Sequence, residues 1–120
     1  METPPFEFAE AEYPLAPLTR YRVGGAARWA LLPRTLEEAQ DAYLWLAGQP
    51  LRTLILGGGS NVLISDKGFD GAALITVGLD GIEALGGDRY RVECGVELND
   101  LVQDVMLPHN YEGVGGLTGI

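Results

Sequence analysis

Three consecutive glycines, Gly57, Gly58 and Gly59, are followed by Ser60 and Asn61, and this run could bind an anion. Glycine has no Cβ, so the backbone N–H groups of such a run can turn toward a phosphate without a steric clash. The hydroxyl of Ser60 and the amide of Asn61 can donate further hydrogen bonds to phosphate oxygens. The run therefore predicts a diphosphate cradle, and an ordinary glycine-rich β-turn is the alternative.

Two familiar phosphate-binding motifs do not fit this run. A dinucleotide-binding G-x-G-x-x-G would begin at Gly57, but position 62 is valine and no helical pattern follows. A Walker A loop needs lysine directly after its last glycine, and Lys67 is the only lysine of the chain. We therefore expect backbone amides to provide most of the contacts to a bound diphosphate.

The remaining chemically reactive side chains predict neither a catalytic nor a metal site. The single histidine, His109, has no second histidine or cysteine cluster beside it, so a surface or helix-end position is expected. Cys94 ends a predicted strand and is expected to be a buried core thiol. Ser60 and Ser65 are the only serines, and neither lies in a nucleophile motif. Trp29, like the other tryptophan, is expected to pack in the core.

A second glycine pair, Gly24 and Gly25, precedes Ala26 and Ala27. The pair indicates a turn, and the small alanines would let a ligand or a neighbouring strand come close. The arginines just before it, at positions 20 and 22, are expected to face solvent, as surface arginines usually do.

The composition limits the class of protein. With 120 residues and a net charge of −9, the chain is the size of one domain and lacks the basic stripe of a nucleic-acid or anionic-membrane binder. A single cysteine excludes an internal disulfide, and no apolar run is long enough to span a membrane. The N-terminus does not resemble a secretory signal, so a cytoplasmic location is expected. The 17 glycines are about twice the average frequency of roughly 7%.

The elements that must position the glycine run follow from patterning. Four of the seven prolines fall in residues 1–17, which predicts an extended arm. A strand is expected at 29–32. Thr35 and Glu38 form a capping-box pattern, which predicts a helix that ends at Gly48 and buries Leu36, Ala39, Tyr43 and Leu46.

The second half of the chain predicts mostly strands. A buried strand is expected at 53–56, an apolar run at 62–64 and another strand at 72–77. Gly86, Gly87 and Asp88 form a turn before a half-buried strand at 89–94, and residues 98–106 form a second helix that ends near Pro108. This order indicates an α+β or α/β domain.

Three segments resemble the N-terminal part of the UDP-N-acetylenolpyruvoylglucosamine reductase family, flavoenzymes of peptidoglycan precursor synthesis. Residues 18–27 are similar to the family's opening N-T-x-x-x-G-G-x-A. Residues 56–63 match its flavin loop, L-G-x-G-S-N-x-L, throughout. Residues 95–102 and 111–120 are similar to the helix and loop that lead into its G-I-P-G-x-V-G-G segment.

The resemblance implies an α+β fold, the N-terminal part of a vanillyl-alcohol-oxidase-type (PCMH-type) FAD-binding domain in which two subdomains hold FAD. It implies that NADPH passes a hydride to FAD, and that reduced FAD reduces UDP-N-acetylglucosamine enolpyruvate to UDP-N-acetylmuramate. The diphosphate would be held by Gly57, Gly58, Gly59, Ser60 and Asn61, and Val62 and Leu63 would also belong to the cofactor-binding residues. The flavin would be approached by Gly116, Thr118, Gly119 and Ile120.

The resemblance also divides the chain. Residues 1–17 are an N-terminal arm, 18–77 a first FAD-binding subdomain and 78–120 the start of a second. The substrate domain and the family's catalytic Ser, Glu and Arg would lie beyond Ile120, so the 120 residues alone are expected to be inactive. The implied partner is a small UDP-sugar, with no nucleic acid and no membrane. The alternatives are a fragment of another flavoprotein oxidase or dehydrogenase of this fold, or a non-catalytic nucleotide-binding module.

Overall fold

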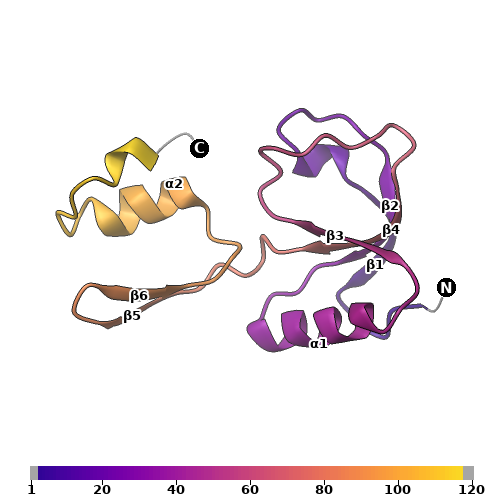
Figure 1. The fold of residues 1–120 in the computed structure, drawn as a ribbon, viewed down its shortest axis with the longest axis horizontal. Coiled ribbons are helices and arrows are strands. Elements are labelled where there is room, and N and C mark those ends of the chain that lie inside the picture. Colours follow the sequence, from indigo (N-terminus) through magenta and orange to yellow (C-terminus); the bar gives the residue numbers. More distant parts are fainter. Residues whose placement is uncertain (1–2, 118–120) are drawn as a thin grey trace.

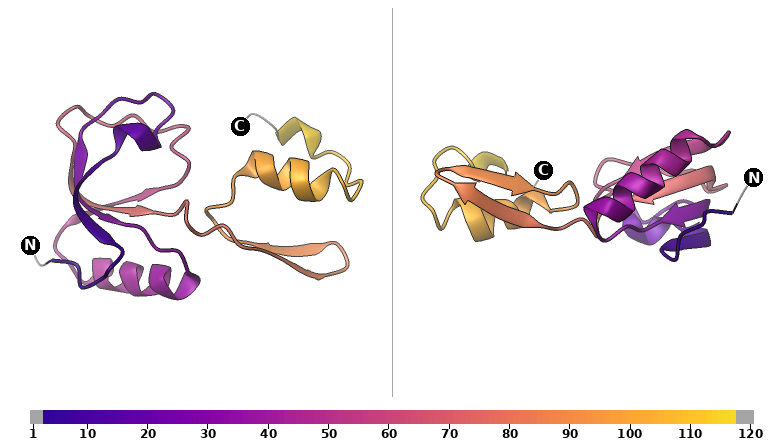
Figure 2. Two further views of the ribbon diagram at one scale, coloured as in Figure 1. Left: turned by 180° about the vertical axis from the view of Figure 1, so that it is seen from behind. Right: turned by 90° about the horizontal axis from the view of Figure 1, so that it is seen from below.

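A computed structural model describes residues 3–117, which form two lobes joined by a short connector (Figure 1). The sheet lobe comprises residues 3–76 and the hairpin lobe residues 82–117. The Cα radius of gyration is 16.3 Å. A single compact domain of this length would have a radius of about 14 Å. The difference reflects the separation of the two lobes, which lie end to end in each view (Figure 2).

The sheet lobe is built on a four-stranded sheet. Its strands are β1 (Ala9–Pro14), β2 (Ala26–Leu31), β3 (Arg52–Leu56) and β4 (Phe69–Ile75), in the spatial order β1-β2-β4-β3. The strand β1 is antiparallel to β2, whereas β2, β4 and β3 are mutually parallel. The carboxyl ends of these three parallel strands therefore lie at one edge of the sheet.

Apolar side chains anchor the N-terminal segment, whose residues 9–14 form the edge strand β1. Leu15 is fully buried, and the Phe6 ring stacks on Phe8 at 4.9 Å between centroids. Pro14, which lacks a backbone donor, is the last residue of this edge strand, where no ladder hydrogen bond is lost. A 3-10 turn, η1 (Ala16–Leu18), leads into the loop that precedes β2.

The predicted first helix is confirmed as α1 (Leu36–Ala47). The Glu38 N–H donates to Thr35 Oγ1 at 3.1 Å, and the Glu38 carboxylate accepts from the Arg34 N–H at 2.8 Å. This is the reciprocal capping that the sequence predicted, with the carboxylate reaching one residue before the N-cap.

The predicted buried face of α1 is partly wrong. Leu46 is buried, but Leu36 and Tyr43 are 57% and 58% exposed. The buried stripe runs instead through Ala42 and Leu46, because the helix packs against β4 residues and Trp45 lies beside the N-terminal aromatic rings. The apolar spacing was compatible with either stripe, and the tertiary contacts select the second one.

The two faces of β4 build two cores. Ala72 and Leu74 face α1, whereas Ala73 and Ile75 pack with Leu56, Leu15 and Ile64 on the opposite face. This alternation follows from the two-residue period of a strand. The loop at 57–68 therefore covers the face of the sheet that α1 leaves open, and the glycine run lies at its start.

Two strand predictions need correction. The strand at 53–56 forms as β3, but it is an edge strand rather than a buried one, so Ile55 is 58% exposed. The apolar run at 62–64 forms no strand, and Leu63 is exposed while Ile64 is buried. The strand predicted at 72–77 is confirmed as the central strand β4.

The hairpin lobe contains an antiparallel hairpin of β5 (Ile82–Gly86) and β6 (Arg89–Val92). Gly86 and Gly87 have φ values of 96° and 59°, which confirms the predicted turn. The second helix begins as α2 (Leu98–Leu101), continues as a π-helix, η2 (Val102–Met106), and is followed by a turn that includes Pro108. The last element is a 3-10 turn, η3 (Gly115–Leu117).

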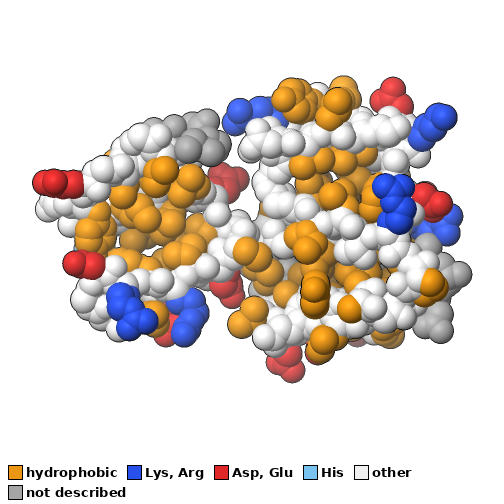
Figure 3. Space-filling view, viewed as in Figure 1, with side chains coloured by type: hydrophobic (Ala, Val, Ile, Leu, Met, Phe, Trp, Pro, Cys, Tyr) orange, Lys and Arg blue, Asp and Glu red, His pale blue; other side chains and the backbone are white. Residues whose placement is uncertain are grey.

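The hairpin lobe leaves apolar surface open. Figure 3 shows apolar side chains gathered on its face between the hairpin and the helix. The exposed large apolar residues of this lobe are Ile82, Leu85, Val92, Leu107 and Leu117.

In the described residues, no helix is both long and apolar enough to cross a membrane.

Candidate functional site

The glycine loop, residues 57–61, leaves the sheet at the carboxyl end of β3. At this edge the Thr76 N–H, directly after β4, donates to the Leu56 carbonyl at 3.0 Å. The ends of the two strands are thus held together at the point where the glycine loop begins. Open parallel sheets bind ligands outside the carboxyl ends of their strands, so the loop lies where a ligand is expected.

Gly59 and Gly58 have different structural roles. Gly59 has a φ of 70°, and a Cβ at this position would overlap the Leu18 carbonyl oxygen and lie 2.9 Å from Thr19 Cα. Its own carbonyl accepts a hydrogen bond from the Arg20 N–H at 3.0 Å. A Cβ at Gly58, in contrast, would meet nothing within 4 Å. Gly59 thus packs the loop against residues 18–20, while Gly58 stays open.

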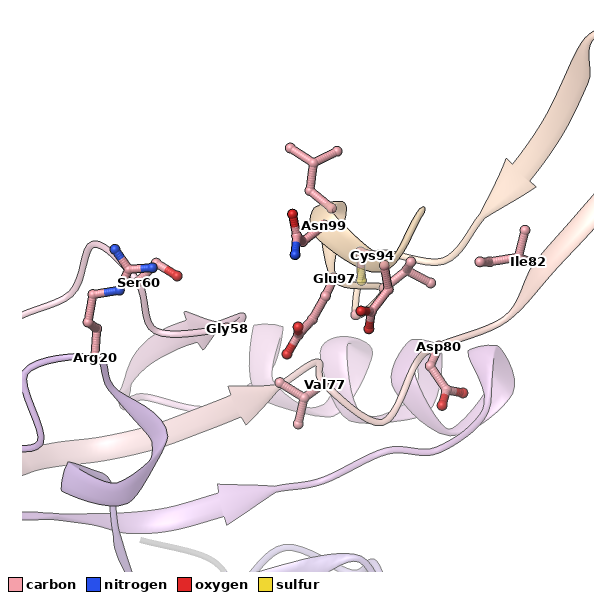
Figure 4. A pocket seen from close by; sticks show the side chains of 13 residues that line it. Arg20, Gly58, Ser60, Val77, Asp80, Ile82, Cys94, Glu97 and Asn99 are labelled. Carbon is pink, nitrogen blue, oxygen red and sulfur yellow. The ribbon is translucent and has the colours of Figure 1, made fainter. Parts of the chain in front are cut away.

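A cavity of about 770 Å³ lies beside the open part of the loop, between the two lobes (Figure 4). Such a volume is typical of small-molecule and cofactor sites. Its lining comes from the loop before β2, the glycine loop after β3, the connector after β4 with the start of β5, and the segment 94–100, which includes the start of α2. The residues are Arg20, Gly58, Ser60, Val77, Asp80, Ile82, Cys94, Gly95, Val96, Glu97, Leu98, Asn99 and Asp100.

Two of the sequence-predicted site residues line this cavity, Gly58 and Ser60. Gly57 and Gly59 flank Gly58 without lining the cavity. The predicted residues Asn61, Val62 and Leu63 follow along the loop outside the lining, and Leu63 is 74% exposed. Gly116 lies in η3 and does not line it either, while Thr118, Gly119 and Ile120 fall outside the described residues.

The structure adds a wall that the sequence reasoning did not assign to the site, residues 94–100. Gly95 brings this wall to the sheet lobe: its N–H donates to the Leu79 carbonyl at 2.8 Å, and a Cβ there would overlap the Thr76 carbonyl oxygen. The motif at 95–97 was the available signal. Cys94 is exposed in this wall, so the predicted buried thiol is wrong: β6 ends at Val92, and Cys94 lies beyond it among the residues that line the cavity.

The charges of the cavity are unevenly placed. Arg20 is the only basic residue in the lining, and it lies near Ser60 at one end (Figure 4). The carboxylates of Asp80 and Glu97 belong to the connector and the opposite wall. The N–H groups of Gly58 and Ser60 donate to no acceptor among residues 3–117. The glycine-loop end of the cavity therefore offers unused donors and one positive charge, which fit a diphosphate.

The single histidine lies outside the cavity. His109 is exposed, and its ring stacks on Tyr111 at 6.0 Å between centroids. The Nδ1–H group of His109 donates to the Val105 carbonyl at 2.7 Å. This confirms its predicted position at the end of a helix. Interaction with the Tyr90 hydroxyl, and a hydrogen bond donated to Asp88 Oδ1 at 2.9 Å, raise the pKa of Tyr111 above its ordinary value. Among residues 3–117 no group of three or more potential metal ligands is present.

Comparison with known proteins gives the class of this chain. A family model described as FAD binding domain matches residues 27–118, more than half of the chain, and the protein belongs to this family. The match covers β2 to η3 and includes the glycine loop and the wall at 94–100. It confirms FAD as the class of cofactor and the FAD-binding α+β fold that the sequence predicted.

Several similar curated proteins carry the name UDP-N-acetylenolpyruvoylglucosamine reductase. The chain is 40% identical to the protein of Synechococcus sp. (strain JA-3-3Ab) over 94 residues, which are 78% of this chain and 30% of the relative. It is 38% identical to that of Cutibacterium acnes over 118 residues, 90% of this chain and 31% of the relative. The chain thus spans about a third of the length of these relatives. The names confirm the resemblance inferred from the three motifs.

Proposed function

We propose that this chain is the FAD-binding N-terminal part of a reductase that converts UDP-N-acetylglucosamine enolpyruvate to UDP-N-acetylmuramate. The observation that carries the proposal is the glycine loop opening through Gly58 and Ser60 into the cavity between the lobes. The shared name of the relatives supports the choice of reaction among flavoprotein activities.

We propose a role for each of the predicted site residues. The Gly58 and Ser60 N–H groups and the Ser60 hydroxyl bind the diphosphate at the carboxyl edge of the sheet. Gly57 and Gly59 set the path of the loop, and Asn61, Val62 and Leu63 continue it. Gly116, with Thr118, Gly119 and Ile120, approaches the flavin from the second subdomain. Bound FAD supplies hydride transfer, with NADPH as the reductant and the UDP-sugar as the acceptor.

We propose the division into an arm at 1–17, a first subdomain at 18–77 and the start of a second at 78–120. The exposed apolar residues of the hairpin lobe support the view that further chain packs on the second subdomain. The catalytic groups then lie outside these 120 residues, and the chain by itself is inactive. A cytoplasmic location and a UDP-sugar as the only class of partner belong to the same proposal.

The test is an assay of the full-length protein that contains this chain. After addition of FAD and removal of the excess, we expect flavin absorbance, bleaching by NADPH, and recovery of the absorbance when UDP-N-acetylglucosamine enolpyruvate is added. A protein without flavin absorbance would overturn the proposal. A flavin that NADPH reduces but the UDP-sugar does not reoxidise would instead indicate another flavoprotein of this fold.

A further inference from the structure

Arg20 lines the cavity, although no motif in the sequence predicted that it belongs to the site. Its side chain is exposed, as the sequence predicted, and it lines the cavity together with Gly58 and Ser60. Figure 4 shows Arg20 and Ser60 at the same end of the cavity, with Glu97 and Asp80 farther along it. Among the described residues, no other basic side chain lines the cavity.

The backbone of Arg20 is fixed to the glycine loop. Its N–H donates to the Gly59 carbonyl at 3.0 Å, so the residue cannot move without moving the loop. The preceding residue, Thr19, is 4% exposed, and its hydroxyl donates to the Ala16 carbonyl at 3.1 Å and accepts from the Arg22 N–H at 3.2 Å. These bonds hold the backbone of Arg20 at the loop before any ligand binds. The backbone therefore loses less conformational entropy when a ligand binds.

The guanidinium of Arg20 has no carboxylate partner in the described part of the chain. The ion pairs there join Arg28 to Asp70 and Arg91 to Glu83. A guanidinium presents five N–H donors in a planar fork that matches phosphate oxygens. The Arg20 fork is therefore free for an anion, beside the unused N–H groups of Gly58 and Ser60.

We propose that Arg20 is a further diphosphate-binding residue, whose guanidinium makes a charge-assisted hydrogen bond to the diphosphate of the bound flavin dinucleotide. The inference rests on the proposed function. It also explains how a chain of net charge −9 binds an anion: the single cation of the cavity stands at the loop, while the acidic residues of the wall and connector keep phosphates from the other end.

The test is a flavin titration of the purified full-length protein, with FAD fluorescence quenching as the readout. A hydrogen bond to a charged group corresponds to about a ten- to hundredfold change in affinity. We therefore expect Arg20→Gln to weaken FAD binding about ten- to hundredfold, and Arg20→Lys to restore part of the loss. The matched control is Arg22→Gln, which removes the same charge two residues away, outside the cavity lining, and should leave the FAD affinity unchanged.

A second measurement separates a ligand contact from a structural role. The thermal unfolding temperature of the FAD-free Arg20→Gln protein should equal that of the wild type, and its FAD affinity should depend less on salt, because one phosphate contact is gone. Equal FAD affinity in wild type and Arg20→Gln would overturn the inference and leave the proposed function intact, and so would an equal loss in Arg22→Gln. A wild-type protein that binds no FAD would overturn both.

Discussion

The two neighbouring glycines of the loop predict opposite outcomes for one substitution. Gly59→Ala should destabilise the protein, since its added Cβ would overlap the Leu18 carbonyl at a φ of 70°. A left-handed alanine costs about 1–2 kcal/mol. Displacement of the loop also breaks the bond from the Arg20 N–H to the Gly59 carbonyl, worth about 1 kcal/mol. The expected loss is about 2–3 kcal/mol of unfolding free energy.

Gly58→Ala should leave stability unchanged and weaken FAD binding. The added Cβ meets no atom of the protein within 4 Å, so unfolding free energy should change by less than about 0.5 kcal/mol. Gly58 lines the cavity, however, and a methyl group there occupies space next to the N–H groups that a diphosphate would use. Overpacking of this kind costs roughly 1–3 kcal/mol, which corresponds to an increase of about 5- to 150-fold in the dissociation constant for FAD.

The assay compares both variants in parallel, by chemical unfolding without FAD and by FAD titration. The assignment predicts a large decrease in unfolding free energy for Gly59→Ala and none for Gly58→Ala. It also predicts that Gly58→Ala binds FAD more weakly although its unfolding free energy equals that of the wild type. The reasoning is refuted if Gly59→Ala unfolds like the wild type, or if Gly58→Ala binds FAD with wild-type affinity. Each variant serves as the control for the other, because the substitutions are identical and the residues adjacent.

Three further predictions concern the elements around the loop. Thr35→Ala should cost about 1 kcal/mol in denaturant unfolding through loss of the helix cap, and an unchanged midpoint would contradict the capping role. Leu56→Ala should lower the unfolding free energy by about 2–5 kcal/mol because Leu56 is fully buried. Leu63→Ala, at a site 74% exposed, should lower it by less than about 0.5 kcal/mol, and similar unfolding curves for the two variants would contradict the burial of Leu56 and the exposure of Leu63. Gly95→Ala, whose Cβ would overlap the Thr76 carbonyl, should lower both thermal stability and FAD affinity, and wild-type values for both would show that the wall does not dock there.

Local chemistry made part of the fold predictable from the sequence. The Thr35–Glu38 pattern fixed the start of α1 because its hydrogen bonds join residues within one turn. The turn at Gly86 and Gly87 was predictable for a similar reason, since both need a positive φ. The apolar run at 72–77 predicted a strand, and β4, which lies between two parallel neighbours, confirms it.

The errors concern properties that depend on distant contacts. Whether β3 is central or at an edge depends on which strands pair, and its own residues do not encode that choice. The same holds for Tyr43, whose exposure depends on which stripe of α1 faces the sheet. The exposure of Cys94 and the place of Arg20 at the cavity could not be predicted, because the cavity forms only when the connector returns the wall at 94–100 to the glycine loop.

The glycines of the site separate into two that pack backbone against backbone and one, Gly58, that has no such contact. Gly59 and Gly95 allow backbone to approach backbone: Gly59 packs the glycine loop against Leu18, and Gly95 packs the wall at 94–100 against Thr76. A larger residue would displace the loop at position 59, or the wall at position 95, before any ligand arrived. Gly58 has no such neighbour, so no contact within the described protein requires its lack of a side chain. The remaining physical reason for a glycine there is the space beside it, which the proposed diphosphate would fill.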